Sequence, residues 1–229
     1  MEKKIYLWGD SIGQGVVYDP ERRRYRLGRG RCEKLLRERG VPLECRARMG
    51  ATVRDGYADF AATPVTDPGL AVIEFGGNDC DLDWQAVSDD PESFHDGRVP
   101  LGRFRETLNG FIREARGRGL TPVLVTPPPL LSERYFAWVS RGKDPESILR
   151  YLGDVEHIAR WQERYAWAVR DEAERNGCRV LDLRREMLEE RNLPDLMSLD
   201  GIHPNERGYE TMARALMGMI PDDAFRAGA

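Results

Sequence analysis

Several features that would mark particular classes of protein are missing from this sequence or scarce in it. None of its apolar runs approaches the roughly 20 residues of a membrane-spanning helix, and the apolar stretch that follows Lys4 is too short for a secretory signal peptide. Its four cysteines are scattered and form no Cys-x-x-Cys pair, which argues against a metal site and a disulfide framework. These absences predict a cytoplasmic protein with free thiols and no membrane partner.

Charge of one sign does not dominate either. The net charge is −4 at pH 7, so broad binding to nucleic acid is not expected. Lysine is scarce, and the most basic run, Arg22 to Arg24, has Asp19 and Glu21 beside it. Such mixed charge is typical of a solvated surface turn. No feature of the sequence supports a homo-oligomer, and the expected partner is a small molecule.

The length and composition are those of an ordinary globular enzyme. The chain has 229 residues, of which 41% are hydrophobic and 32% charged. A chain of this size can bury a substantial core within one domain. It contains no internal repeat and no linker, so we predict a single domain over residues 1–229.

Short apolar runs rich in β-forming residues alternate with longer stretches of helical periodicity. This alternation predicts a parallel sheet covered by helices on both faces. Gly40, Gly119 and Gly177 follow three of the helical stretches, where a left-handed residue commonly ends a helix. The predicted strands are 4–8, 43–48, 70–75, 122–126 and 179–183, and the predicted helices are 30–39, 53–62, 101–118, 155–176 and 206–219.

Polar residues follow the predicted strands at the points where the strands end. Ser11 follows the first strand, Gly50 the second and Asn78 the third, while Asp200 and His203 come after the fifth. In an open parallel sheet, ligands bind at the carboxyl ends of the strands. The five residues are therefore expected to meet at one edge of the sheet.

These residue types fit nucleophilic catalysis. A serine hydroxyl needs a base to take its proton, and a carboxylate orients that base. The chain has three histidines, and His203 is the one that follows the fifth predicted strand together with an acid, Asp200, three residues before it; His95 and His157 are interpreted as surface or structural residues. We therefore predict Ser11, His203 and Asp200 as catalytic residues. The Gly50 N–H and the Asn78 amide are candidates for an oxyanion hole.

At this point the sequence resembles the SGNH superfamily of GDSL-type hydrolases. The resemblance rests on four blocks in the family's order: Gly9-Asp10-Ser11-Ile12, Gly50, Gly76-Gly77-Asn78-Asp79 and Asp200-Gly201-Ile202-His203. It implies a three-layer α/β/α sandwich, flavodoxin-like, with a five-stranded parallel sheet. It also implies a carboxylic-ester hydrolase that forms an acyl-serine intermediate without metal or other cofactor, with an oxyanion hole made by Ser11, Gly50 and Asn78.

Other interpretations remain open at this stage. Residues 9–13 also satisfy Gly-x-Ser-x-Gly, the nucleophile elbow of α/β-hydrolases. That interpretation is disfavoured, because in that fold an oxyanion loop precedes the serine and the histidine commonly stands far from its acid. An acyltransferase or a thioesterase would use the same triad, and a non-catalytic binding module could share the fold.

Two long stretches, 80–100 and 127–153, break the alternation and are predicted to be irregular lid or binding loops. Each contains a tryptophan, Trp84 and Trp138, that could bind substrate. Their rings would either stack on a sugar face or pin the lid to the body. The expected substrate is a short-acyl ester such as an acetylated saccharide, and no residue in the sequence fixes the acyl length.

Overall fold

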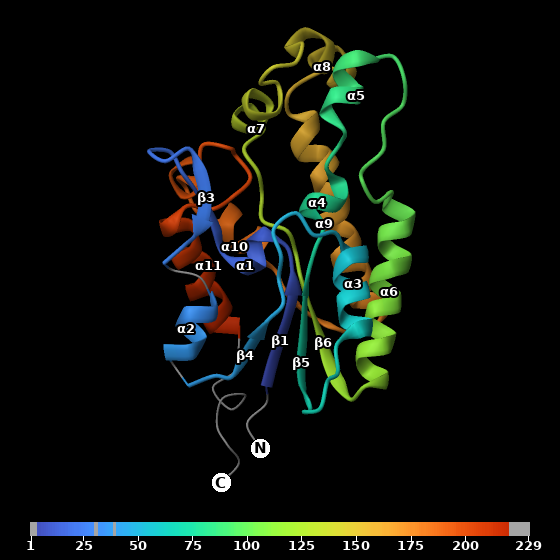
Figure 1. Ribbon diagram of the computed structural model, residues 1–229, viewed down its shortest axis with the longest axis vertical. Coiled ribbons are helices and arrows are strands. Elements are labelled where there is room, and N and C mark those ends of the chain that lie inside the picture. The colour runs from blue at the N-terminus through green and yellow to red at the C-terminus, as the bar shows by residue number, and fades with distance from the viewer. Residues whose placement is uncertain (1–3, 30–31, 39, 220–229) are drawn as a thin grey trace.

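Five parallel strands form the centre of the protein (Figure 1). The computed structural model describes residues 4–29, 32–38 and 40–219. The strand order is β4-β1-β5-β6-β7, in which the second strand along the chain lies outside the first. This is the 2-1-3-4-5 order of flavodoxin-like sheets. The strands are β1 (Lys4–Gly9), β4 (Leu43–Cys45), β5 (Gly69–Glu74), β6 (Leu120–Val125) and β7 (Arg179–Leu181).

The prediction of a parallel sheet is confirmed, and β1, one of its inner strands, shows why the sequence signals it. Ile5, Tyr6, Leu7 and Trp8 are consecutive and all buried, because helices cover both faces of the sheet. The predicted second strand, 43–48, is longer than β4, which ends at Cys45. Beyond it, single backbone hydrogen bonds from Arg46 to Leu7 and from Arg48 to Gly9 continue along β1.

Helices cover the two faces of the sheet and give three layers (Figure 1). On one face, Phe60, Phe104, Phe111 and Tyr165 share a buried cluster with Trp8; they belong to α3 (Val53–Ala62), α6 (Leu101–Gly117) and α9 (His157–Arg175). The other face is covered by α2 (Cys32–Glu38), α10 (Leu183–Leu188), a 3-10 turn (Leu193–Leu196) and α11 (Glu206–Met219). The predicted three-layer sandwich is therefore confirmed.

The two long stretches predicted to be irregular contain helices. They are α5 (Trp84–Asp89), α7 (Ser132–Val139) and α8 (Pro145–Leu152). Together these helices lie beyond the carboxyl edge of the sheet (Figure 1). They share a hydrophobic cluster that includes Val87, Tyr135, Ile148 and Ile158 and is separate from the clusters against the sheet. We call α5, α7 and α8 with their connections the cap.

A two-stranded hairpin that the sequence analysis missed lies between β1 and α2. It consists of β2 (Val16–Asp19) and β3 (Arg24–Leu27), which pair antiparallel. The turn between them carries Arg22 and Arg23, which are exposed, as expected for a solvated surface turn. Tyr18 and Tyr25 face each other across the hairpin, with ring centroids 5.3 Å apart.

Within the described residues, none of the helices combines the length and apolarity that a bilayer crossing requires.

Asp79 ties one of the sheet-covering helices to the loop after β5. Its Oδ1 accepts a hydrogen bond from the Val53 N–H at the start of α3 (2.9 Å), and its Oδ2 accepts one from the Gly76 N–H (3.0 Å). The side chain is fully buried. Burial raises the pKa of Asp79 to about 7, even though both N–H groups favour the ionised form.

This raised pKa makes stability depend on pH in a defined direction. The folded state binds the Asp79 proton more tightly than the unfolded chain does, so the contribution is largest below about pH 4 and is lost as pH rises to about 7. Between pH 5 and pH 8, wild type should lose on the order of 3 kcal/mol relative to Asp79→Asn, at about 1.4 kcal/mol per pH unit. Urea unfolding of both proteins at the two pH values measures this difference. An unchanged difference would show that Asp79 is ionised throughout.

Candidate active site

Ser11 stands at the start of a short helix directly after the first strand. Asp10 caps α1 (Ser11–Gln14), accepting a hydrogen bond from the Ile12 N–H at 2.8 Å. Asp10 and Ser11 are both buried. The strand end and the cap thus fix Ser11 at the carboxyl edge of the sheet, where the sequence analysis placed it.

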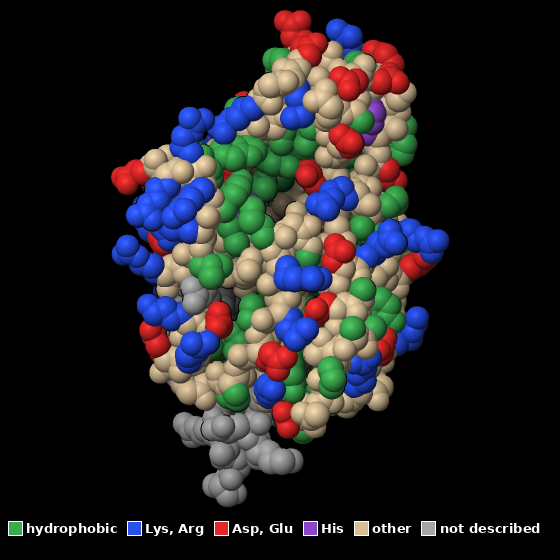
Figure 2. Space-filling model, in the orientation of Figure 1, with side chains coloured by type: hydrophobic (Ala, Val, Ile, Leu, Met, Phe, Trp, Pro, Cys, Tyr) green, Lys and Arg blue, Asp and Glu red, His purple; other side chains and the backbone are tan. Residues whose placement is uncertain are grey.

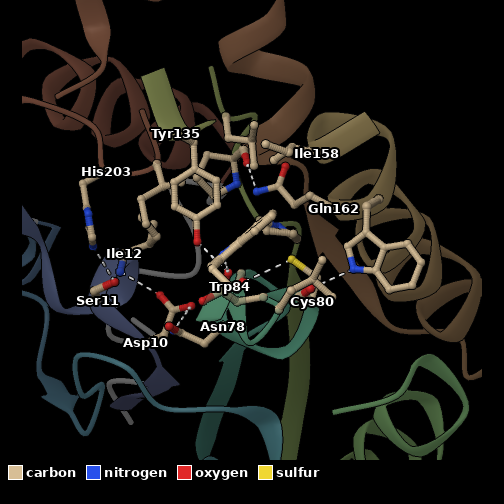
Figure 3. A pocket seen from close by; sticks show the side chains of 18 of the residues that line it. Asp10, Ser11, Ile12, Asn78, Cys80, Trp84, Tyr135, Ile158, Gln162 and His203 are labelled. Carbon is tan, nitrogen blue, oxygen red and sulfur yellow. Dashed lines mark hydrogen bonds between the residues drawn. The ribbon is translucent and has the colours of Figure 1, made fainter. Parts of the chain in front are cut away.

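His203 and Asp200 come from the loop that precedes α11. The Asp200 Oδ1 accepts hydrogen bonds from the backbone N–H groups of Ile202 and His203, both at 3.1 Å, and its Oδ2 lies 2.7 Å from His203 Nδ1. The other ring nitrogen, Nε2, lies 2.8 Å from Ser11 Oγ (Figure 3). Residues 192 positions apart therefore form one hydrogen-bonded chain from carboxylate to hydroxyl.

The charge of Asp200 determines which ring nitrogen of His203 carries the proton. Burial alone would raise the pKa of Asp200, but the hydrogen bonds from the His203 ring and from the backbone outweigh burial and leave the pKa below its ordinary value. An ionised Asp200 accepts the Nδ1 proton, which leaves Nε2 as an acceptor facing the Ser11 hydroxyl. This is the tautomer that a general base requires.

Asn78 lies beside Ser11, on α4 (Gly77–Cys80) at the end of β5. Its Nδ2 donates to Asp10 Oδ2 and to the Ala51 carbonyl, both at 3.1 Å. Gly50 precedes Ala51 and has φ +77°, a left-handed conformation that favours glycine. Gly50 therefore lies at the same edge of the sheet, although it is not among the residues that line the cavity next to Ser11.

A cavity of about 70 Å³ opens beside Ser11 and His203, between the sheet edge, the cap and α9. In the space-filling view, hydrophobic side chains gather around a hollow in this part of the molecule (Figure 2). Its walls are mostly apolar and aromatic, with a few polar groups. The lining includes Ile12, Asn78, Cys80, Asp81, Leu82, Trp84, Leu130, Tyr135, Leu152, His157, Ile158, Trp161 and Ile202.

The two tryptophans predicted to bind substrate have different positions. Trp84 lines the cavity, whereas Trp138 does not. The Trp138 ring packs edge-on against Tyr18 of the hairpin (4.8 Å), and the guanidinium of Arg141 covers it at 3.9 Å. Trp138 therefore joins the cap to the hairpin, which matches the second of the two roles predicted for these rings.

Two further cavity residues are His157, which was given a surface or structural role from the sequence, and Cys80. His157 lies at the start of α9 and stacks on Trp161, with ring centroids 6.2 Å apart. Cys80 is buried, and burial raises the pKa of its thiol well above the ordinary value. A thiol in this state is inert as a nucleophile. Among the described side chains, no three His, Cys, Asp or Glu residues are grouped as a metal site would need.

Glu74, the last residue of β5, is a site residue that the sequence analysis missed. Its Oε2 accepts hydrogen bonds from the backbone N–H groups of Asp10 (3.1 Å) and Gly13 (3.0 Å). A Cβ on Gly9 would stand only 2.7 Å from that oxygen, so the glycine makes room for the carboxyl group. The other oxygen, Oε1, is buried and hydrogen-bonds to no described residue. In sequence, Glu74 shows only as a polar residue inside an apolar run.

Burial and the neighbouring Asp10 carboxylate raise the pKa of Glu74 well above its ordinary value. Burial also raises the pKa of Asp10, but hydrogen bonds from Ile12 and Asn78 favour its ionised form. Of the two, Glu74 is therefore the group expected to hold a proton. A neutral Glu74 beneath α1 would fix the helix that carries Ser11 without adding a second buried charge.

Glutamine has the shape and hydrogen-bonding groups of a neutral Glu74. Glu74→Gln should keep the free energy of unfolding within about 1 kcal/mol and activity within about ten-fold, since an isosteric change that keeps its partners costs little. Glu74→Ala should lose roughly 2–6 kcal/mol, because two buried N–H groups lose their acceptor. Denaturant unfolding and initial rates measure both. Equal losses of stability and activity in the two variants would mean that Glu74 is ionised.

Comparison with known proteins agrees with this architecture. Residues 7–211 match the model of the GDSL-like lipase/acylhydrolase family. The fold is similar to that of a lipase/acylhydrolase from Enterococcus faecalis (21% identity, 95% of each chain covered, TM-score 0.64). It is also similar to that of a GDSL-like lipase from Bacteroides thetaiotaomicron (17% identity, 95% of this chain and 87% of the other, TM-score 0.61). No protein with a curated description matches the chain in sequence.

Proposed function

Because this chain belongs to the GDSL-like lipase/acylhydrolase family and is a carboxylic-ester hydrolase, we propose that it cleaves esters of short acids through an acyl-serine intermediate. The observation that carries the proposal is the Asp200–His203–Ser11 chain, with contacts of 2.7 and 2.8 Å, at the wall of a 70 Å³ cavity. The hydrogen bonds among these three residues activate the Ser11 hydroxyl as a nucleophile, and the cavity has room for a small acyl group.

In this scheme His203 Nε2 takes the proton of the Ser11 hydroxyl while Oγ attacks the ester carbonyl carbon. The tetrahedral intermediate collapses when His203 transfers this proton to the leaving alcohol, and the acyl group stays on Ser11. Water then attacks the acyl-serine with His203 again as base, which releases the acid and restores the serine. Asp200 remains ionised and holds the His203 ring in place.

The negative oxygen of the intermediate needs hydrogen-bond donors. We assign this role to the backbone N–H groups of Ser11 and Gly50 and to the amide of Asn78. Both hydrogens of that amide already have acceptors in the resting site, Asp10 and the Ala51 carbonyl. Donation to the oxyanion would therefore replace or share one of these two bonds.

The size of the cavity supports a short acyl group. At about 70 Å³, it has about half the volume of an engineered 150 Å³ cavity that holds benzene. About three or four non-hydrogen atoms would fill it on that scale. With the carbonyl group held at Ser11 and the oxyanion hole, the one to three alkyl carbons of acetyl to butyryl groups would fit, and longer chains would force side chains of the cap out of their packing.

A series of 4-nitrophenyl esters from acetyl to octanoyl tests this size limit. We expect kcat/KM to fall at least about ten-fold between butyryl and octanoyl, in line with the cost of overpacking a well-packed site. Ile158→Ala, which removes part of the cavity wall, should move the optimum to longer acyl groups. Rates that keep rising to octanoyl in wild type would contradict an acyl-binding cavity.

The alcohol half of the ester is a separate question. The sequence predicts an acetylated saccharide, so acetylated xylo-oligosaccharides belong in the same screen. That narrower prediction has less support than the short acyl group, because Trp138 lies outside the cavity and Trp84 donates its indole N–H to Asp81. Release of free acid without an added alcohol acceptor would separate hydrolysis from acyl transfer.

A further inference from the structure

Asp81 places a carboxylate in the wall of the cavity, and the triad makes no use of it. The residue directly follows α4, three positions after Asn78, and its carbonyl accepts a hydrogen bond from the Arg98 N–H (2.9 Å). Its Oδ1 accepts hydrogen bonds from the Tyr135 hydroxyl (2.6 Å) and the Trp84 indole N–H (2.8 Å). Tyr135 and Trp84 can be seen around the middle of the pocket (Figure 3). These contacts hold the carboxylate in one orientation.

Only one oxygen of the Asp81 carboxylate accepts hydrogen bonds from described side chains. Both side-chain donors go to Oδ1, and no described side chain hydrogen-bonds to Oδ2. A carboxylate oxygen can accept about two hydrogen bonds. Burial raises the pKa of Asp81, whereas Tyr135, Trp84 and the backbone N–H of Leu82 favour the ionised form. Oδ2 thus keeps capacity to accept a hydrogen bond from a ligand in the cavity.

The apolar surroundings of Asp81 Oδ2 decide which ligand groups can bind next to it. Leu82, Leu130, Leu152 and Ile158 are the apolar neighbours in the wall, and no lysine or arginine is among the described residues that line the cavity. An alkyl group placed there would displace water from the carboxylate and give it no hydrogen bond in return, which is unfavourable. A hydroxyl or an ammonium would replace the lost water.

We propose that Asp81 selects esters whose acyl group carries a hydrogen-bond donor, a hydroxyl or an ammonium, at the end remote from the carbonyl. The inference rests on the proposed function, because it takes the cavity to receive the acyl group. Asn78 and Asp81 are about one helical turn apart, or roughly 5–6 Å between Cβ atoms. With Asn78 at the carbonyl oxygen, this spacing suits a donor on the third carbon.

Three ethyl esters with matched acyl groups test the proposal: butyrate, 3-hydroxypropionate and 3-aminopropionate. Their acyl groups have the same number of non-hydrogen atoms and differ only in the terminal methyl, hydroxyl or ammonium. In wild type we expect kcat/KM for at least one donor-bearing ester to exceed that for butyrate by about 10–100-fold, the range for a hydrogen bond to a charged group. Which of the two esters gains identifies the donor.

Asp81→Asn should remove this preference. Tyr135 and Trp84 both donate to the position of Oδ1, so the amide oxygen must stay there, and the NH₂ group takes the place of Oδ2. A donor on the substrate then meets a donor on the protein, and the ratio should fall to about one or below. Asp83→Asn is the matched control, because Asp83 is exposed and caps α5 through the N–H groups of Gln85 and Ala86. It should leave the ratio unchanged.

Equal rates for the three esters in wild type, with hydrolysis still dependent on Ser11, would overturn the role of Asp81 and leave the proposed function standing. This wild-type ratio does not depend on whether Asp81→Asn folds. Ethyl and 2-hydroxyethyl butyrate form a second pair; if Asp81→Asn changed that ratio instead, the donor would belong to the alcohol, and the proposal would be wrong. Hydrolysis of no ester above the Ser11→Ala rate would overturn both proposals.

Discussion

Replacing Ser11 with alanine is expected to lower kcat for ester hydrolysis by about a million-fold, as the loss of a triad serine does in other enzymes. Ser11 Oγ is the hydroxyl that lies 2.8 Å from His203 Nε2, so the substitution removes both the attacking atom and the proton that His203 takes. The backbone N–H groups remain, and they would sustain only a small residual rate.

The measurement is steady-state hydrolysis of 4-nitrophenyl acetate, with labelling by an organophosphonate as a second readout. Wild type should take up one phosphonyl group on Ser11, and Ser11→Ala should take up none. Ser132→Ala serves as the matched control, since Ser132 is equally buried and hydrogen-bonded, to Glu156 at 3.0 Å. A Ser11→Ala protein within about a hundred-fold of wild type would rule out the acyl-serine route, given the size of the expected loss.

Asp200→Asn should lower kcat by about ten-thousand-fold, the loss seen when a triad aspartate becomes asparagine. The hydrogen bonds around Asp200 specify the reason. Two backbone N–H groups donate to Oδ1, so the amide oxygen of asparagine must occupy that position, and its NH₂ must face His203 Nδ1. The ring would then carry its proton on Nε2 and present a donor to the Ser11 hydroxyl, which is the wrong tautomer for a base.

This effect has its own control. Asp182→Asn changes another acid whose side chain accepts a backbone hydrogen bond, that of the Arg185 N–H at the start of α10, but Asp182 lies outside the cavity next to Ser11. We expect Asp182→Asn to keep kcat and to change the free energy of unfolding by less than about 1 kcal/mol, because asparagine caps a helix as well as aspartate does and the half-exposed ion pair with Arg170 contributes little. If Asp200→Asn kept more than about a tenth of wild-type kcat, the tautomer argument would be contradicted, because the wrong tautomer alone should cost far more.

The sheet and the triad could be predicted from the sequence because each has a strong local signal. Strands buried on both faces, such as β1, are continuous apolar runs, and α6 keeps Phe104, Leu108 and Phe111 on one buried face. The Asp200 and His203 pair is local, because the carboxylate binds the backbone and the ring of a residue three positions on. Parallel strands then bring Ser11 and His203 to the same edge, despite their distance in sequence.

The cap and the hairpin could not be predicted in the same way. Helices α5, α7 and α8 have only six to eight residues, and helices this short depend on tertiary packing rather than on periodicity. The same limit applies to Trp138, whose neighbours Tyr18 and Tyr25 lie more than a hundred residues away in sequence. The role of Glu74 depends on its protonation next to the buried Asp10 carboxyl group, and no sequence pattern reveals a protonation state.

The separate hydrophobic cluster of the cap has a consequence for how such an enzyme can change. Ser11, Asp200 and His203 are held by the strand ends and by the loop before α11, whereas most of the wall that would meet the acyl group belongs to the cap and α9. Chemistry and selectivity therefore reside in different segments of the chain. Exchange of the segments between α4 and α6 and between β6 and α9 for those of a relative should transfer a substrate range while leaving the triad and Asn78 in place.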